Sequence, residues 1–284
     1  MPDARVTLPT LKEWKKTQRK ITALTAYDYT LARYLDAAGV DLILVGDSLG
    51  MVALGHDTTL PVTMDEMIHH TRAVRRGVHH ALVVGDMPFM SYQVSSEQAV
   101  ANAGRFIQEG GAEAVKLEGG ARVEERVRAI VQAGISVMGH LGLTPQSVHQ
   151  FGGYKVQGKT YLDARRIKSD ALKLQKAGVF ALVLEGIPAE LAGEITGELE
   201  IPTIGIGAGP HCDGQILVTQ DLLGLNPDFV PKFVKQYANL GGELQQAVRQ
   251  YMEEVRTGLF PAPEHTYETR REVLKPVPPR DAQG

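Results

Sequence analysis

A recurring pattern constrains the fold of this chain most strongly: a short apolar run that ends in a polar residue beside glycine. In DLILVGDSLG, residues 41–50, four apolar residues are followed by Gly46, Asp47 and Ser48. Further runs of the same kind lead to Asp28, Asp86, Glu118, His140 and Glu185, and a seventh ends in glycines alone. Runs that are apolar on both faces suit parallel strands covered by helices. The pattern therefore predicts a buried parallel sheet with polar residues at its strand ends.

Segments typical of helices separate these runs. They cover residues 29–38, 64–76, 95–110, 122–133 and 163–177, and a further one starts at Pro188. Glycine follows most of them, as expected at helix C-termini. Strands that alternate with helices predict βαβ units. Seven strands are clear, and residues 214–225 are a candidate for the eighth. The chain is therefore predicted to be an α/β protein, a (β/α)8 TIM barrel. A doubly wound sheet is the alternative, but polar residues at so many strand ends favour the barrel.

The segments outside this alternation are few. We expect one catalytic domain over residues 1–265, in which residues 1–19 cap the barrel floor and residues 243–256 form an amphipathic helix. Residues 266–284 are rich in proline and polar side chains, which predicts a flexible tail.

Composition narrows the classes of partner. A net charge of -3 argues against broad electrostatic attraction to nucleic acid. The N-terminus lacks the pattern of a signal peptide, and no run reaches the roughly 20 apolar residues that span a membrane. The single cysteine, Cys212, excludes an intrachain disulfide and a cysteine-rich zinc site. We therefore expect a cytoplasmic protein with no nucleic-acid or membrane partner.

Three carboxylates follow three different predicted strands. In a barrel the C-terminal strand ends share one mouth, so Asp47, Asp86 and Glu118 are expected to converge there. Close carboxylates repel one another unless a cation or a shared proton compensates. Oxygen ligands without a cysteine or histidine pair favour a hard cation such as Mg²⁺. The alternative is that each acid caps the helix that follows it.

Three other polar residues at strand ends are candidates for substrate contact or proton transfer. Lys116 shares a strand face with Glu118; it could bind a substrate carboxylate or phosphate, form a Schiff base, or pair with an acid. Glu185, if partly shielded from water, could act as a general base, or it could cap the next helix. His140 could orient a substrate oxygen or move a proton, or it could be a core histidine with satisfied hydrogen bonds.

Ten segments of the chain resemble, in their order and their amino-acid sequence, motifs of the ketopantoate hydroxymethyltransferase family. They are TAYDY, LVGDSLGM, GHDTTLPVT, HTRAVRRG, GDMPFMSY, VKLEGG, GHLGLTPQSV, FGGYKVQG, IGIGAG and DGQILV. The resemblance runs from about residue 7 to residue 265. It implies a barrel of the phosphoenolpyruvate mutase/isocitrate lyase type. It also implies transfer of a hydroxymethyl group from 5,10-methylenetetrahydrofolate to 3-methyl-2-oxobutanoate, giving 2-dehydropantoate for pantothenate and coenzyme A synthesis.

The resemblance also implies roles for single residues. Asp47 and Asp86 would contact Mg²⁺ and substrate, with Glu118 completing the metal environment. Ser48 and Lys116 would bind the ketoacid. Glu185 would accept the proton in a Mg²⁺-assisted enolisation that precedes an aldol-type addition. The role of His140 stays open between orienting substrate and orienting a neighbouring acid.

The resemblance further implies a homo-oligomer, a decamer of two pentameric rings, and it leaves rival activities to consider. A Mg²⁺-dependent 2-oxoacid C–C lyase of the same superfamily is the main alternative. Such lyases usually carry a loop cysteine, and no such motif surrounds Cys212. A Schiff-base aldolase using Lys116 and a barrel that only binds a ligand are further alternatives.

Overall fold

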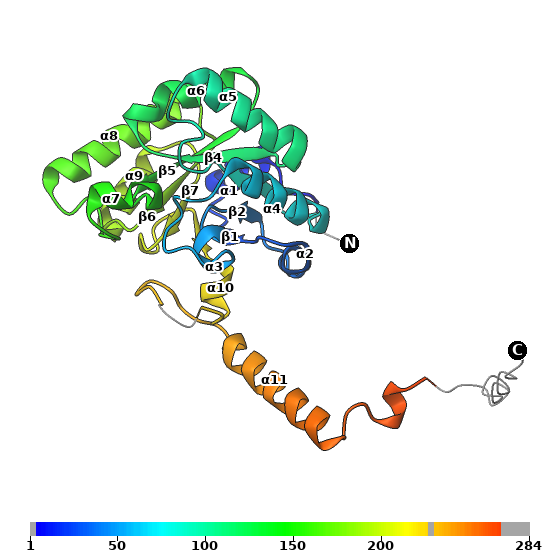
Figure 1. The fold of residues 1–284 in the computed structure, drawn as a ribbon. Helices are drawn as coiled ribbons and strands as arrows, with labels where there is room; N and C mark the ends of the chain where they lie inside the picture. The colour runs from blue at the N-terminus through cyan, green and yellow to red at the C-terminus, as the bar shows by residue number, and fades with distance from the viewer. Residues whose placement is uncertain (1–3, 227–229, 268–284) are drawn as a thin grey trace, which may run out of the picture. The chain divides into compact units, whose positions relative to one another are not determined.

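The computed structural model describes residues 4–226 and 230–267, and its centre is a closed barrel of eight parallel strands (Figure 1). Each strand pairs with the next in chain order, and β1 pairs with β8 to close the barrel. The strands are β1 Ile21–Thr25, β2 Leu42–Val45, β3 Leu82–Asp86, β4 Ala114–Glu118, β5 Val137–Gly142, β6 Ala181–Glu185, β7 Thr203–Ile206 and β8 Gly214–Leu217. The predicted (β/α)8 fold is confirmed, with the eighth strand inside the segment expected to supply it.

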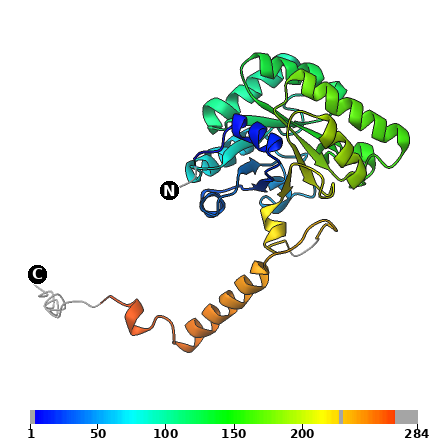
Figure 2. The ribbon, with the colours of Figure 1, turned by 180° about the vertical axis from the view of Figure 1, so that it is seen from behind.

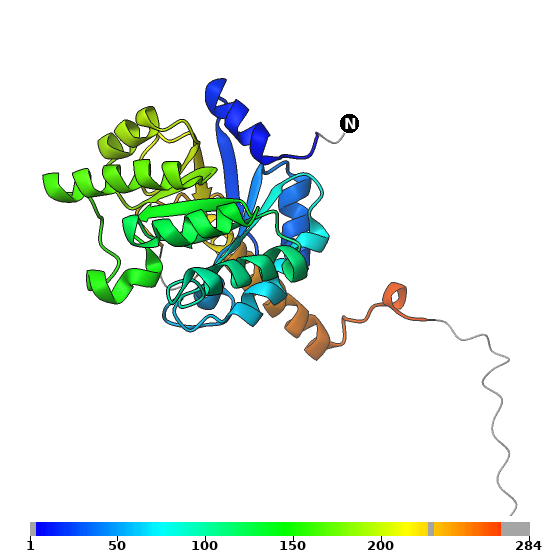
Figure 3. The ribbon, with the colours of Figure 1, turned by 90° about the horizontal axis from the view of Figure 1, so that it is seen from above.

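Helices surround the barrel, as Figures 1 and 3 show. The α-helices are α1 Leu8–Lys16, α2 Tyr29–Ala37, α3 Leu49–Val52, α4 Met64–Gly77, α5 Ser96–Arg105, α6 Glu124–Gln132, α7 Val148–Phe151, α8 Tyr161–Ala177, α9 Ala189–Glu198, α10 Thr219–Leu222 and α11 Leu240–Thr257. A π-helical turn, η1 Phe106–Gly110, extends α5, and three 3₁₀ turns are η2 Ala121–Val123, η3 Pro145–Ser147 and η4 Pro263–His265. The four-residue helices α3, α7 and α10 were not predicted, because one helical turn is too short to show a periodicity.

Local capping explains where the longer helices begin and end. Thr63 accepts a hydrogen bond from the backbone of Glu66, whose carboxylate bonds back to Thr63, so a capping box starts α4. Thr160 caps α8, which begins at Tyr161, two residues ahead of the predicted start. Gly178, with φ of 102°, ends α8 in the left-handed region that glycine adopts without strain.

The N-terminal ends of the strands are covered by α1, the dark blue helix in Figure 2. Leu11 of α1 is fully buried, and it packs in one cluster with the first residues of several strands. Among them are Leu42, Leu82, Ala114 and Ala181, which open β2, β3, β4 and β6. This apolar cluster fills the N-terminal end of the barrel, opposite the strand ends that carry the predicted site residues.

The chain divides into two compact units, Met1–Ala238 and Asn239–Gly284. The described part of the second unit consists of α11 and η4. No residue of α11 is buried, and Leu244, Val248, Tyr251 and Val255 form an exposed apolar stripe along it. The helix agrees with the amphipathic helix predicted for residues 243–256. The single domain over residues 1–265 stays a prediction, and residues 268–284 of the expected tail lie outside the described residues.

Across residues 4–226 and 230–267, no helix has the combined length and apolar character that a membrane crossing requires.

Candidate active site

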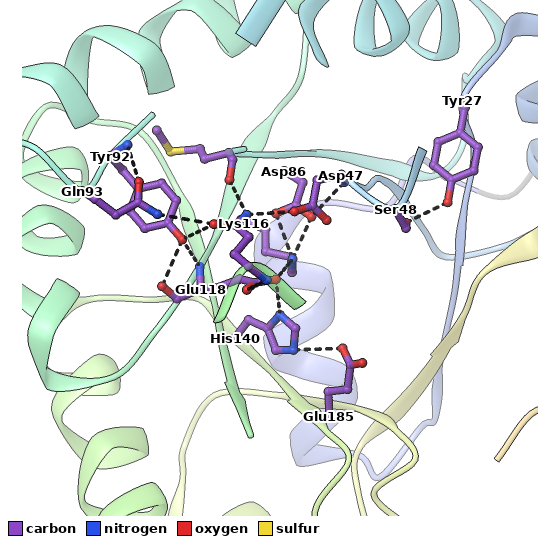
Figure 4. Close-up of polar contacts among 12 residues, drawn as sticks. Tyr27, Asp47, Ser48, Asp86, Tyr92, Gln93, Lys116, Glu118, His140 and Glu185 are labelled. Carbon is purple, nitrogen blue, oxygen red and sulfur yellow. Dashed lines mark hydrogen bonds and ion pairs between the residues drawn. The ribbon is translucent and has the colours of Figure 1, made fainter. Parts of the chain in front are cut away.

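The barrel brings the predicted site residues together at the C-terminal strand ends (Figure 4). Strand register places them: Asp86 of β3 lies beside Lys116 of β4, and Glu118 lies beside His140 of β5. Glu185 ends β6 next to Gly142. Asp47, Asp86, Lys116, Glu118 and His140 are all at least 95% buried, an unusual gathering of charge in a protein interior.

A buried ion pair joins two of these strands. The ammonium of Lys116 donates hydrogen bonds of 2.8 Å to both carboxylate oxygens of Asp86, and it lies 3.7 Å from Glu118. Burial alone would lower the pKa of Lys116, but the carboxylates of Asp86, Glu118 and Asp47 raise it above its usual value. The lysine therefore stays charged, which favours the ion-pair and anion-binding interpretations over the Schiff base, since that reaction needs a neutral amine.

The three carboxylates differ in how their surroundings shift their pKa values. Burial, followed by the nearby charges of Asp86 and Glu118, raises the pKa of Asp47 well above its usual value. Burial also raises the pKa of Asp86, although Lys116 opposes the shift. Burial raises the pKa of Glu118 too, but His140 and Lys116 outweigh it and lower the pKa overall. Asp47 is thus the acid whose charge is least compensated.

His140 lies between two carboxylates. Its Nδ1 is 3.4 Å from Glu118 Oε1, and its Nε2 is 3.2 Å from Glu185 Oε2. Burial and Lys116 lower its pKa, but the two carboxylates raise it to about 9. Among the described residues, neither ring nitrogen nor Glu118 Oε1 has a partner at hydrogen-bond geometry. The core-histidine alternative is not supported, because a structural histidine would have its hydrogen bonds satisfied.

The helix-capping alternative is not supported either. Ser48, Ser95, Gly120 and Pro188 occupy the N-cap positions that follow the four acids. Ser48 makes no capping bond, and its hydroxyl lies 2.9 Å from the hydroxyl of the buried Tyr27.

Two functional candidates, Tyr92 and Gln146, were missed although both lie in segments that the sequence analysis singled out. The side-chain amide of Gln146 donates to Asp47 (2.9 Å), and its backbone N–H donates to Glu118 (3.0 Å). The hydroxyl of Tyr92 donates to the Gln146 amide oxygen (2.7 Å). Glutamine carries no charge and follows no strand directly, so sequence offered no signal beyond the resemblance of the segment.

The charge balance of the cluster fits a divalent cation. Asp47, Asp86, Glu118 and Glu185 face two cationic groups, Lys116 and His140, so negative charge is in excess. Oxygen donors of this kind suit Mg²⁺, which usually takes one or two carboxylates and completes its shell with water or substrate. Within the described part of the chain, no three acids or histidines are already arranged as a metal-binding group. The fit to a cation therefore rests on the excess negative charge of these oxygen donors.

A cavity of about 190 Å³ adjoins the cluster and shares Glu118 and Gln146 with it. Its outer wall carries Arg122 and Arg126, and Phe89 exposes an aromatic ring beside it. The guanidinium of Arg122 donates to the neutral partners Gln150 and Ser147. The cavity therefore offers a positively charged surface next to the buried acids.

Known sequences of one family match most of this chain. Residues 5–263 match the family model described as ketopantoate hydroxymethyltransferase. A 3-methyl-2-oxobutanoate hydroxymethyltransferase of Moorella thermoacetica is 61% identical over 264 residues, which cover 93% of this chain and 98% of that protein. One of the same name from Syntrophomonas wolfei is 58% identical over 271 residues, covering 95% and 98%.

Solved structures share the fold at low sequence identity. Phosphonopyruvate hydrolase, in a complex with oxalate and Mg²⁺, superposes with a TM-score of 0.60 at 12% identity, covering 92% of this chain and 93% of that one. The 2,3-dimethylmalate lyase of the PEP mutase/isocitrate lyase superfamily gives 0.56 at 17%, covering 94% and 92%. These likenesses confirm the predicted (β/α)8 barrel fold, which this chain shares with a member of the PEP mutase/isocitrate lyase superfamily.

Proposed function

The chain belongs to the ketopantoate hydroxymethyltransferase family, and we propose that it transfers a hydroxymethyl group from 5,10-methylenetetrahydrofolate to 3-methyl-2-oxobutanoate. The product would be 2-dehydropantoate, for pantothenate and coenzyme A synthesis. The observation that carries the proposal is the buried cluster of Lys116, Asp86, Asp47 and Glu118 beside the partly exposed Glu185.

Binding of the ketoacid would use the cationic side of this cluster. A 2-oxoacid carries a carboxylate and a keto oxygen on adjacent carbons. Lys116 would offset the carboxylate charge, because its ammonium is held charged inside the barrel. Ser48 would donate to a substrate oxygen, since the Tyr27 hydroxyl at 2.9 Å can in turn donate to Ser48.

Asp47, Asp86 and Glu118 would hold Mg²⁺. When bound beside the keto oxygen, the cation would supply electrostatic stabilisation for charge that develops there. Excess negative charge in the cluster supports this assignment.

Glu185 would remove the hydrogen from C3 of the ketoacid. Its carboxylate side chain is 15% exposed, so it can exchange protons with water, and His140 lies 3.2 Å away on the side of the cluster. His140 would hold the Glu185 carboxylate in place by charge attraction. The C3 carbanion would then form a bond to the one-carbon unit of the donor. Both carbon–nitrogen bonds of that unit would break, water would supply the hydroxyl oxygen, and tetrahydrofolate would leave with the proton from C3 and one proton from water.

The cavity lined by Arg122 and Arg126 would take part of the donor. Methylenetetrahydrofolate is too large for the buried cluster, and it carries carboxylates that a guanidinium binds well. The cavity opens beside Glu118 and Gln146, so a donor seated there would lie next to the ketoacid.

We also propose that the chain works as a homo-oligomer, and the family resemblance sets the number at ten. The exposed apolar stripe of α11 supports self-association, since monomeric proteins rarely leave such a surface uncovered. Light scattering coupled to size exclusion would give the mass, and a monomer would contradict the proposal.

The direct test supplies the full chain with 3-methyl-2-oxobutanoate, methylenetetrahydrofolate and Mg²⁺ and detects 2-dehydropantoate by mass spectrometry. Product should form, and Glu185→Gln should slow it by about 10²–10⁴-fold, the usual contribution of a general base. Absence of product together with cleavage of 2,3-dimethylmalate would favour the lyase instead.

A further inference from the structure

Gln146, in the η3 turn after β5, joins two strands of the site although it belongs to neither. Its side-chain amide donates a hydrogen bond to Asp47, which follows β2 in the chain. Its backbone N–H donates to Glu118 at the end of β4. The residue is 6% exposed, so these hydrogen bonds are shielded from water. A single residue thus connects two of the three acids to which the proposed function assigns Mg²⁺.

The orientation of the Gln146 amide is fixed by a neighbour that can only accept. The carbonyl oxygen of Met87 lies 3.0 Å from Nε2, so this atom must be the amide nitrogen rather than the oxygen. The second hydrogen of Nε2 then necessarily points to Asp47 Oδ2. The amide cannot be reversed without placing two acceptors against each other.

Tyr92 fixes the other end of the amide. Its hydroxyl oxygen lies 3.2 Å from the backbone nitrogen of Glu118, which can only donate. The hydroxyl proton has two acceptors within reach, Gln146 Oε1 at 2.7 Å and the Glu118 carbonyl oxygen at 3.2 Å, and the contact to Gln146 is the shorter. Figure 4 shows Tyr92 beside Glu118 at this edge of the cluster. Tyr92 and Gln146 thus link Glu118 to Asp47, and the Met87 carbonyl fixes the orientation of the amide between them.

We propose that Gln146 is a positioning residue: its amide holds one oxygen of Asp47 and its backbone N–H holds one oxygen of Glu118, so both acids keep a fixed orientation toward the substrate site. The inference rests on the proposed function. An amide suits this position because it donates without adding a charge. A lysine there would neutralise Asp47 and compete with a bound cation, whereas Gln146 leaves the second oxygen of Asp47 available.

Two variants separate this role from simple packing. Gln146→Met keeps the approximate length of the side chain and removes its donors and acceptor. Gln146→Glu keeps the shape and the acceptor for Tyr92 but replaces the donor to Asp47. The backbone N–H to Glu118 remains in both. Gln132→Met is the matched control, because Gln132 is an exposed glutamine at the end of α6 and takes no part in these hydrogen bonds.

The experiment measures Mn²⁺ binding to the substrate-free full chain by electron paramagnetic resonance, with kcat and KM for the ketoacid alongside. Gln146→Met should weaken Mn²⁺ binding, and both Gln146 variants should lower kcat by about 10- to 100-fold, the usual effect of losing a group that orients a ligand. Gln132→Met should match the wild type. Tyr92→Phe should have a smaller effect than either variant, because the Met87 carbonyl still orients the amide.

The outcomes are distinguishable. A folded Gln146→Met or Gln146→Glu protein that binds Mn²⁺ and turns over like the wild type would overturn the inference while leaving the proposed function intact. Should Gln146→Met fail to fold, the isosteric Gln146→Glu decides. A wild type that makes no 2-dehydropantoate would overturn the proposed function and this inference with it.

Discussion

Replacing Lys116 by methionine removes one of the two cationic groups from the buried cluster with little change in side-chain length. In the native protein the Lys116 ammonium lies 2.8 Å from each oxygen of Asp86 and 3.7 Å from Glu118. The Lys116→Met variant would leave these acids buried without their main countercharge.

The expected loss of stability follows from this geometry. Removing one partner of a buried ion pair costs about 3–5 kcal/mol, because the other charge stays in a poorly solvated place. Asp86 can limit the cost by binding a proton, since burial already raises its pKa. This proton costs about 1.4 kcal/mol for each unit by which the pH exceeds the unfolded pKa of about 4, so we expect a loss of about 4 kcal/mol near neutral pH.

The pH dependence has a definite sign. Without Lys116, the folded-state pKa of Asp86 moves further above its unfolded value, so the folded variant holds a proton that the unfolded chain releases. Stability is then lost as the pH rises from the unfolded value of about 4 through the folded one. The deficit of Lys116→Met should therefore be smaller at about pH 5 than at about pH 8.

Guanidinium unfolding followed by far-UV circular dichroism, with EDTA present, measures this deficit at both pH values. Lys173→Met replaces an exposed lysine of α8 and is the matched control; it should leave the free energy of unfolding nearly unchanged. A Lys116→Met protein within about 1 kcal/mol of the wild type at the higher pH would refute the reasoning, since that is the range of an exposed pair.

Three further predictions test the floor, the base and the donor cavity. Leu11→Ala should cost about 2–5 kcal/mol in denaturant unfolding, because Leu11 is fully buried; an unchanged midpoint would mean that α1 does not seal the barrel. Gly142→Ala should lower kcat by about 10²-fold, because Gly142 has a φ of 97° and an added methyl would overlap the Glu185 carbonyl oxygen and displace this residue; normal turnover would contradict this. Arg122→Gln should raise KM for the folate donor by about tenfold and leave KM for the ketoacid unchanged; an equal rise in both would place Arg122 elsewhere in the reaction.

The barrel and the gathering of its strand-end residues could be predicted from sequence, since parallel strands carry their C-terminal residues to one side. The nearness of His140 to Glu118 and Glu185 also follows from strand order, because β5 lies between β4 and β6. The contact itself depends on side-chain rotamers, which the order of strands does not determine.

The positioning network could not be predicted for a different reason. Gln146 lies in a turn between a strand and a helix, and its partners Asp47 and Tyr92 are 99 and 54 residues away. Such contacts depend on how loops fold over the barrel, and no local periodicity records them. The sequence also left the partner of Lys116 undetermined, because either a neighbouring acid or a substrate anion can neutralise a buried lysine.

Removal of the C3 hydrogen by Glu185 is the central step, and proton NMR of 3-methyl-2-oxobutanoate in D₂O tests it without a folate donor. With the full chain and Mg²⁺ present, the C3 proton signal should disappear, and EDTA or the Glu185→Gln variant should prevent the loss. Exchange that continues at the same rate in Glu185→Gln, or no exchange in the wild type even after tetrahydrofolate is added, would contradict the assignment of Glu185 as the base.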